Sequence, residues 1–176
     1  MLLGLVGSEM CIRDRASGAR LQRFQHNDLT DLERRLETLA GLPGSVVVLS
    51  ESLFSMEGTS PDVAALAALC QRFGADLLMD EAHALGVLGP EGRGLCFGIE
   101  PVRLISGTFG KAFGSGGAFL ACDADLGDAL LQTSGAFRYT TALAPPLVAG
   151  AQAALDLIQS HPHWCRQLQK LSLIHI

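Results

Sequence analysis

The chain has 176 residues, of which 48% are hydrophobic and 18% are charged, and its formal net charge is −5. This length is enough for one domain with a sizeable core. The arginines are scattered and form no basic stripe, and no apolar run reaches the length of a transmembrane helix, so we expect neither a nucleic-acid nor a membrane partner.

The five cysteines are widely spaced and include no Cys-x-x-Cys pair. This pattern is typical of reduced, mostly buried thiols in a cytoplasmic protein, and it disfavours a disulfide framework or a zinc site. The positions are Cys11, Cys70, Cys96, Cys122 and Cys165.

Both ends of the chain differ from the rest. Residues 7–15 and 171–176 resemble translated sequencing-adapter sequence. We therefore predict that residues 1–15 are a non-native scar and that residues 166–176 are a tail that ends in a second scar. Residues 16–165 would then be part of one large domain, cut at both ends.

The first predicted elements are a helix and a strand. Thr30-Asp-Leu-Glu33 has the form of a capping box, and leucines at helical spacing follow it before Gly41. Residues 45–50, Ser-Val-Val-Val-Leu-Ser, are β-branched and apolar, which predicts a strand buried on both faces.

A second helix and strand follow. Ser60 is the predicted N-cap, with Pro61 at the first helical position, and Gly74 closes the helix. Residues 75–80 form the next predicted strand. A strand, a helix and a second strand within residues 45–80 predict a parallel sheet.

A glycine-rich connection, with Gly86, Gly89, Gly92 and Gly94, follows His83. Beyond it, residues 102–105 and 118–122 are predicted strands, close enough for the second to return beside the first. Asp123 is expected to cap a helix that runs to about Thr133. Residues 137–146 are predicted to be extended, and a helix is predicted from Pro146 to about Ser160.

Polar side chains follow three successive predicted strands. Ligand sites in open α/β sheets gather outside the carboxyl ends of the strands, so we expect these side chains to converge. The pairs are Glu51 with Ser55, Asp80 with His83, and Thr108 with Lys111.

Lys111 is one of only two lysines among 13 basic residues, and it lies in the glycine- and hydroxyl-rich run 106–117. Glycines let the backbone approach a ligand closely, and a partly desolvated amine has the lowered pKa that imine chemistry needs. The run therefore predicts a Schiff-base lysine beside a phosphate. The alternative is a glycine-rich turn with an incidental lysine.

Two nucleotide-binding motifs do not fit this run. A P-loop would need glycine where Ile105 stands and a hydroxyl where Ala112 stands, and a dinucleotide fingerprint would need glycine at Phe119. The segment Asp80-Glu-Ala-His83 also spells a helicase box, but no P-loop precedes it.

Asp80 ends a strand predicted to be buried, where a carboxylate is costly unless it is paired. A protonated ring nitrogen, such as that of pyridoxal phosphate (PLP), is one suitable partner, and the alternative is a turn or helix cap. His83 could contact the same ring or satisfy loop carbonyls. We predict no metal site, because His161 and His163 are typical of a solvated turn.

Six motifs, in order along residues 20–160, together resemble the α-oxoamine synthases, which are PLP enzymes of the aspartate-aminotransferase fold. The resemblance implies an α/β fold, a three-layer sandwich around a mostly parallel sheet, of which this chain would hold part of the PLP-binding large domain (fold type I). The motifs are His26-Asn-Asp28, Glu51-Ser-Leu-Phe-Ser-Met-Glu-Gly58, Asp80-Glu-Ala-His-Ala-Leu-Gly-Val-Leu-Gly89, Gly92-Arg-Gly94, Thr108-Phe-Gly-Lys-Ala-Phe-Gly114 and Tyr139-Thr-Thr141.

The resemblance implies three catalytic residues. Lys111 would hold PLP as a Schiff base and later move protons at the substrate carbon. Asp80 would pair with the pyridine nitrogen, and His83 would contact the ring hydroxyl of the cofactor.

The resemblance also implies further cofactor contacts. Ser55 and Thr108 would touch the cofactor, Thr108 at its phosphate. Thr140 and Thr141 match a segment that reaches the phosphate of the neighbouring subunit, so a homodimer is implied.

The substrates implied are an amino acid and an acyl thioester, joined with decarboxylation. The forms of the motifs at 80–94 and 108–115 favour L-alanine and a pimeloyl thioester, and the alternative is a sibling such as glycine C-acetyltransferase. The alternatives from other classes are a nucleotide-binding ATPase and a non-catalytic α/β module. Family segments before residue 20 and after residue 165 would complete the site, so we expect this piece to be poorly active alone.

Overall fold

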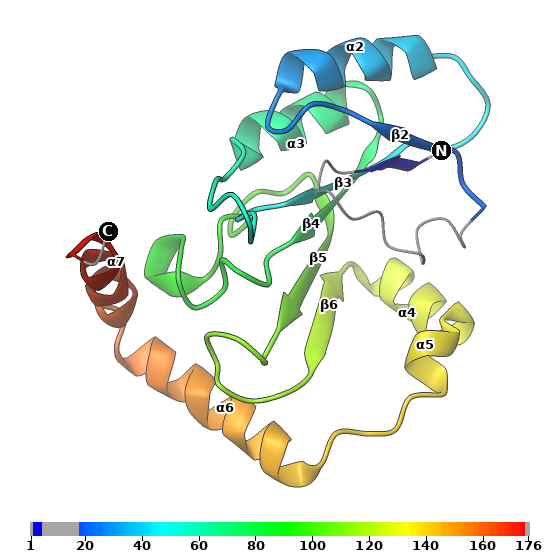
Figure 1. The fold of residues 1–176 in the computed structure, drawn as a ribbon. Helices are drawn as coiled ribbons and strands as arrows, with labels where there is room; N and C mark the ends of the chain where they lie inside the picture. Colours follow the sequence, from blue (N-terminus) through cyan, green and yellow to red (C-terminus); the bar gives the residue numbers. More distant parts are fainter. Residues whose placement is uncertain (1, 5–17, 175–176) are drawn as a thin grey trace. The chain divides into compact units, whose positions relative to one another are not determined.

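The computed structural model describes the backbone of residues 2–4 and 18–174 and the side chains of residues 18–172. Figure 1 shows its helices and strands, with their labels. The chain divides into two compact units. Unit 1 is built from residues 1–80 and 98–103, and unit 2 from residues 81–97 and 104–176.

Unit 1 holds four parallel strands in the order β2-β1-β3-β4. Strands β3 and β4 confirm the two predicted strands, and their register places Glu51 opposite Asp80 at the carboxyl ends. The bounds are β1 (Leu2–Gly4), β2 (Leu21–Arg23), β3 (Val47–Glu51) and β4 (Asp76–Asp80).

Strand β1 lies within the first 15 residues, which the sequence suggests are non-native, and it pairs with β2 and β3. Backbone pairing needs no particular side chains, so an apolar segment of any origin can form such a strand. That residues 1–15 are non-native therefore stays a prediction.

Helices α2 (Leu29–Leu39) and α3 (Val63–Arg72) pack with the strands of unit 1 to form its core. Both helices carry their buried residues at a spacing of three or four, and β4 alternates buried and less buried residues. This is the pattern expected for helices covering a sheet. The largest fully buried apolar side chains here are Leu32, Leu36, Leu66, Leu77, Met79, Val48 and Cys70.

Both helix starts differ from the prediction by about two residues. The N-cap of α2 is Asp28, whose carboxylate accepts the Asp31 backbone N–H at 2.9 Å, and not Thr30. The N-cap of α3 is Asp62, which accepts the Ala65 N–H, and not Ser60. In each case a carboxylate on an extended residue satisfies a free helical N–H, and the competing hydroxyl side chain is not used.

Unit 2 contains an antiparallel strand pair followed by helices. Strand β5 (Val102–Thr108), whose first two residues belong to unit 1, pairs with β6 (Ala118–Cys122), so the predicted return is confirmed. Helix α4 (Ala124–Thr133) begins at the predicted cap Asp123, and α6 (Pro145–Ser160) matches the other predicted helix.

Two helices of unit 2 were not predicted. Helix α5 (Gly135–Arg138) occupies the start of the segment predicted to be extended, and α6 occupies its end, so that prediction is wrong for residues 137, 138, 145 and 146. Its cap, Ser134, accepts the Phe137 backbone N–H. Helix α7 (Trp164–Ile174) covers most of the predicted tail, and a short 3-10 turn, η1 (Pro90–Gly92), lies in the glycine-rich connection.

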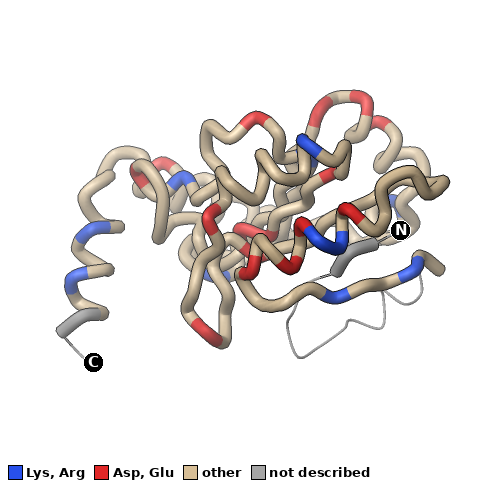
Figure 2. Tube along the Cα trace, turned by 90° about the horizontal axis from the view of Figure 1, so that it is seen from above, with Lys and Arg blue, Asp and Glu red and all other residues tan. Residues whose placement is uncertain are grey.

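Charges and thiols are spread along the chain. Figure 2 shows acidic and basic residues interspersed along the described part of the trace. No helix among the residues that the structure describes has the length and apolar character needed to cross a bilayer. Four of the cysteines are free thiols, as predicted, and Cys11 lies outside the described residues; the four are Cys70, Cys96, Cys122 and Cys165.

Asp31 is a buried carboxylate that joins the β2–α2 connection to the first turns of α2. It accepts the Gln25 backbone N–H at 2.8 Å and the Arg35 side chain at 3.0 Å, and it also pairs with Arg34. The hydrogen bond from Arg34, followed by those from Gln25 and Arg35, lowers the pKa of Asp31 to about 2.

Because the folded pKa of Asp31 lies below its unfolded value of 3.8, its charge stabilises unit 1 above about pH 4, and that stabilisation is lost as the pH falls toward 2. We expect Asp31→Asn to lower the urea midpoint at neutral pH and to flatten its decline between pH 4 and 2. Glu33→Gln is the control, because the exposed Glu33–Arg72 pair should leave the decline nearly unchanged. An unaltered pH profile in Asp31→Asn would contradict this assignment.

Candidate functional site

His83 lies in a tight turn that follows Asp80, the last residue of β4. The turn is closed by hydrogen bonds from the Ala84 and Leu85 backbone N–H groups to the Glu81 carbonyl oxygen, both 2.9 Å. The Glu81 N–H donates to the Ser106 carbonyl oxygen of β5, also at 2.9 Å. The position of His83 is therefore fixed relative to β5.

The loop that carries Lys111 connects β5 to β6 and is closed by its own hydrogen bonds. The Thr108 hydroxyl donates to the Gly117 carbonyl oxygen and accepts the Gly110 N–H, both at 3.1 Å. The Phe109 N–H donates to Gly117 at 2.9 Å, and the Ser115 N–H donates to Phe109 at 2.8 Å. Thr108 thus organises the loop, and its contact with the cofactor phosphate stays a prediction.

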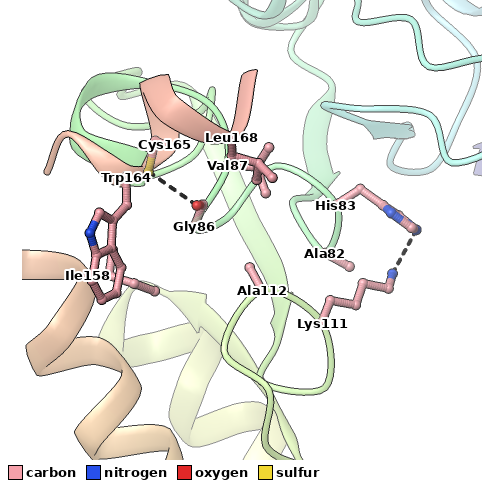
Figure 3. A pocket seen from close by; sticks show the side chains of 10 residues that line it. All are labelled: Ala82, His83, Gly86, Val87, Lys111, Ala112, Ile158, Trp164, Cys165 and Leu168. Carbon is pink, nitrogen blue, oxygen red and sulfur yellow. Dashed lines mark hydrogen bonds between the residues drawn. The ribbon is translucent and has the colours of Figure 1, made fainter. Parts of the chain in front are cut away.

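The two loops bring Lys111 and His83 together. The Lys111 Nζ and His83 Nε2 atoms lie 2.8 Å apart, and Figure 3 shows the two side chains facing each other. Lys111 is exposed and His83 is half-buried. An imidazole nitrogen at this distance can exchange a proton with the amine. A lysine must lose such a proton before it can act as a nucleophile.

The two loops also lie against each other at Gly86, whose φ is +78°. A Cβ atom at this position would lie 2.7 Å from the Ala112 Cβ, closer than real Cβ atoms approach a neighbour. Both the positive φ and the contact with the residue after Lys111 require glycine here. The glycine-rich connection is therefore a packing surface for the lysine loop.

A pocket of about 440 Å³ lies beside the pair (Figure 3). Its walls come from the His83 turn, the lysine loop and helices α6 and α7, and the Cys165 thiol donates to the Gly86 carbonyl oxygen at 3.2 Å. The lining residues are Ala82, His83, Gly86, Val87, Lys111, Ala112, Ile158, Trp164, Cys165 and Leu168.

The contribution of α7 was missed because its residues fall at the end of the predicted domain and in the predicted tail. The signal was present in the sequence, since Trp164, Leu168 and Leu171 recur at helical spacing. An apolar stripe of this kind indicates a helix that buries one face. Trp164 and Leu168 of that face line the pocket.

The other predicted site residues lie on exposed positions. Ser55 follows β3 and Asp80 ends β4 in unit 1, whereas Thr140 and Thr141 follow α5 in unit 2. The Asp80 side chain is exposed here, so the argument that burial forces it to pair is wrong for this chain. The convergence of Ser55 and Asp80 with Lys111 on one cofactor stays a prediction.

The comparison with known families identifies the fold. The family model for aminotransferase class I and II matches residues 13–172, which is nearly the whole chain. The chain belongs to this family. The predicted α/β fold with a mostly parallel sheet is thereby confirmed.

Among curated relatives, the 8-amino-7-oxononanoate synthase of Gluconacetobacter diazotrophicus is 48% identical over 143 residues. The match covers 81% of this chain and 36% of the relative, so the chain spans little more than a third of that protein. The predicted resemblance to this group of enzymes is confirmed.

Solved structures of related enzymes also match this chain. Serine palmitoyltransferase from S. paucimobilis, with a bound PLP–myriocin aldimine, matches with a TM-score of 0.85 and 28% identity over 96% of this chain and 43% of its own. 8-Amino-7-oxononanoate synthase from Francisella tularensis matches with a TM-score of 0.73 and 27% identity, over 89% of this chain and 46% of its own.

The hydrogen bonds of Thr108 can be tested directly. Thr108→Val removes the hydroxyl that bonds Gly117 and Gly110 while keeping the β-branched shape, so we expect a loss of about 1–3 kcal/mol in the free energy of unfolding. Thr108→Ser keeps the hydroxyl and should lose less than about 1 kcal/mol. Equal losses in the two variants, measured by urea unfolding, would show that the hydroxyl does not organise the loop.

Proposed function

We propose that the chain is the central part of a PLP-dependent acyltransferase of the 8-amino-7-oxononanoate synthase type. The reaction would condense L-alanine with a pimeloyl thioester, with loss of carbon dioxide, in biotin synthesis in the cytoplasm. The observation that supports this most directly is the Lys111–His83 contact, made at 2.8 Å by two of the motifs that the family resemblance marks as catalytic.

The residues present fit PLP. An exposed amine on a glycine-rich loop is available to its aldehyde, and the small side chain of Ala82 and the backbone of Gly86 leave space beside that amine. When bound, PLP supplies an electron sink for a carbanion at the substrate carbon.

The side chains near the sheet edge have separate tasks. Lys111 would hold the cofactor and then exchange the proton of the substrate carbon, with His83 placed to accept or return a proton at Nζ. Asp80 would bind the protonated ring nitrogen. Ser55 and Thr108 would orient the cofactor, Thr108 through the loop that it closes.

We further propose that the complete protein is a homodimer in which Thr140 and Thr141 reach the cofactor phosphate of the partner. Both are exposed on the irregular segment between α5 and α6. Exposed hydroxyls beside the large apolar side chains Phe137 and Tyr139, 62% and 83% exposed, are suited to a surface that a second subunit covers.

A second candidate is another α-oxoamine synthase, such as one that takes glycine or serine. The TM-score of 0.85 to serine palmitoyltransferase favours this alternative, since it exceeds the 0.73 found for 8-amino-7-oxononanoate synthase. The sequence identity of 48% to a named 8-amino-7-oxononanoate synthase, against 28% to the palmitoyltransferase, favours the first candidate. Assays with alanine, glycine and serine separate the two.

The cofactor proposal is tested by trapping. Incubating the chain with PLP should give a yellow absorbance band, and borohydride should fix the cofactor on Lys111, as found by peptide mass spectrometry. Lys111→Ala should abolish the band and the adduct. Lys170→Ala is the matched control, because it removes the only other lysine and should leave both signals intact.

Equal labelling of Lys111 and Lys170, or a band that survives Lys111→Ala, would contradict a specific cofactor site. ATP binding without PLP binding would instead favour the ATPase alternative. Binding of neither ligand would favour the non-catalytic module.

The activity of the isolated chain is a further test. Because the relative is covered only to 36%, we expect turnover of alanine and pimeloyl thioester at least about 100-fold below that of the full-length relative, since incomplete positioning alone has such an effect. The measurement is thioester consumption by both proteins side by side. Comparable rates would show that the residues for catalysis all lie in this chain.

A further inference from the structure

Glu81, which none of the assigned roles uses, is the most buried charged residue of the described structure, with 1% of its surface exposed. Burying a carboxylate is unfavourable unless its oxygens are hydrogen-bonded. Here Oε2 accepts the Leu95 backbone N–H at 3.0 Å and Oε1 accepts the Cys96 N–H at 2.8 Å. Both oxygens are thus satisfied by consecutive backbone groups of one loop.

The loop at residues 94–96 packs directly against the Glu81 carboxylate. A Cβ atom at Gly94 would lie 1.9 Å from Glu81 Oε2, and the φ of Gly94 is +88°, so only glycine fits. The Cys96 thiol also lies against Glu81, and burial, together with the Glu81 carboxylate, raises the pKa of that thiol. The side chain therefore fixes the end of the glycine-rich connection.

The backbone of the same residue fixes the other two parts of the site. Its N–H donates to the Ser106 carbonyl oxygen, five residues before Lys111, and its carbonyl oxygen closes the turn that contains His83. Three segments therefore meet at Glu81: the His83 turn, strand β5 and the loop that ends at Cys96. Losing the carboxylate would leave two inward-facing N–H groups without partners beside the His83 turn.

We propose that Glu81 is a positioning residue that holds His83 in contact with Lys111, an inference that rests on the function proposed above. Its backbone sets the turn and its carboxylate stops the turn from shifting, so that the distance between His83 Nε2 and Lys111 Nζ stays at 2.8 Å. The side chain of Glu81 bonds Leu95 and Cys96 rather than Lys111, so its effect on the amine passes through His83.

The test measures the reactivity of Lys111 with Lys170 as an internal reference in the same chain. Glu81→Gln places an amide group against one of the two N–H donors, and Gly94→Ala pushes on the carboxylate from the loop side. In both variants we expect the ratio of PLP trapped by borohydride at Lys111 to that at Lys170 to fall about tenfold or more. The pH profile of Lys111 acetylation by acetic anhydride should also shift.

Cys96→Ala is the matched control, because it alters a buried neighbour and keeps the Cys96 backbone N–H. It should change the labelling ratio by less than about twofold and leave the acetylation profile in place. If Glu81→Gln does not fold, Glu81→Asp decides the question, since it keeps the charge but is too short to reach both N–H groups.

The outcomes are distinct. Lower urea midpoints with wild-type labelling and wild-type acetylation profiles would overturn the proposal and leave Glu81 a purely structural residue. If the wild-type chain forms no PLP adduct at Lys111, the proposed function fails, and the acetylation profiles still decide whether Glu81 holds His83 against Lys111.

Discussion

The hydrogen bond from the Glu81 backbone N–H to the Ser106 carbonyl oxygen joins the turn that contains His83 to strand β5, which leads into the loop that contains Lys111. One loop presents His83 and the other presents Lys111, and neither is part of a helix or strand. Loops are held less firmly than regular elements unless their backbones are tied down. The hydrogen bond to β5 holds the His83 turn in place beside the lysine loop. The 2.8 Å contact between Lys111 Nζ and His83 Nε2 depends on this hydrogen bond.

Close backbone approach is the second constraint on this region. Gly86 and Gly94 both have positive φ, and a side chain at either would collide, with Ala112 in one case and with Glu81 in the other. Closely packed loops of this kind cannot absorb an added side chain, so a substitution at either glycine would displace the residues that it contacts. The glycines thus allow the His83 turn and the lysine loop to lie directly against each other.

The chain is only part of the length of its relatives, and unit 2 leaves apolar side chains exposed. The chain spans 36% of the relative from Gluconacetobacter diazotrophicus, and many apolar side chains of unit 2 are exposed, including Leu120, Leu131 and Leu143. Apolar surface of this extent is unusual for a protein that stands alone. In the proposed enzyme, further chain and a second subunit would cover it and complete the site.

The sequence determined most of the element types and singled out Lys111 and His83, which the structure brings together. Alternating and helical apolar patterns indicated β3, β4, α2, α3, β6 and α6, because burial against a sheet imposes a period on the residues themselves. The rarity of lysine and the glycine-rich run marked Lys111 without any structure. Motif order indicated the family that the comparisons confirm.

Other features were decided only by tertiary structure. Several side chains near each helix start could serve as the cap, and the path of the chain selected Asp28 and Asp62 rather than Thr30 and Ser60. The role of Glu81 arises from backbone N–H groups 14 and 15 residues away, which no local pattern encodes. Sequence patterns report which residues must be buried or flexible, whereas contacts between distant backbone groups exist only once the chain has folded.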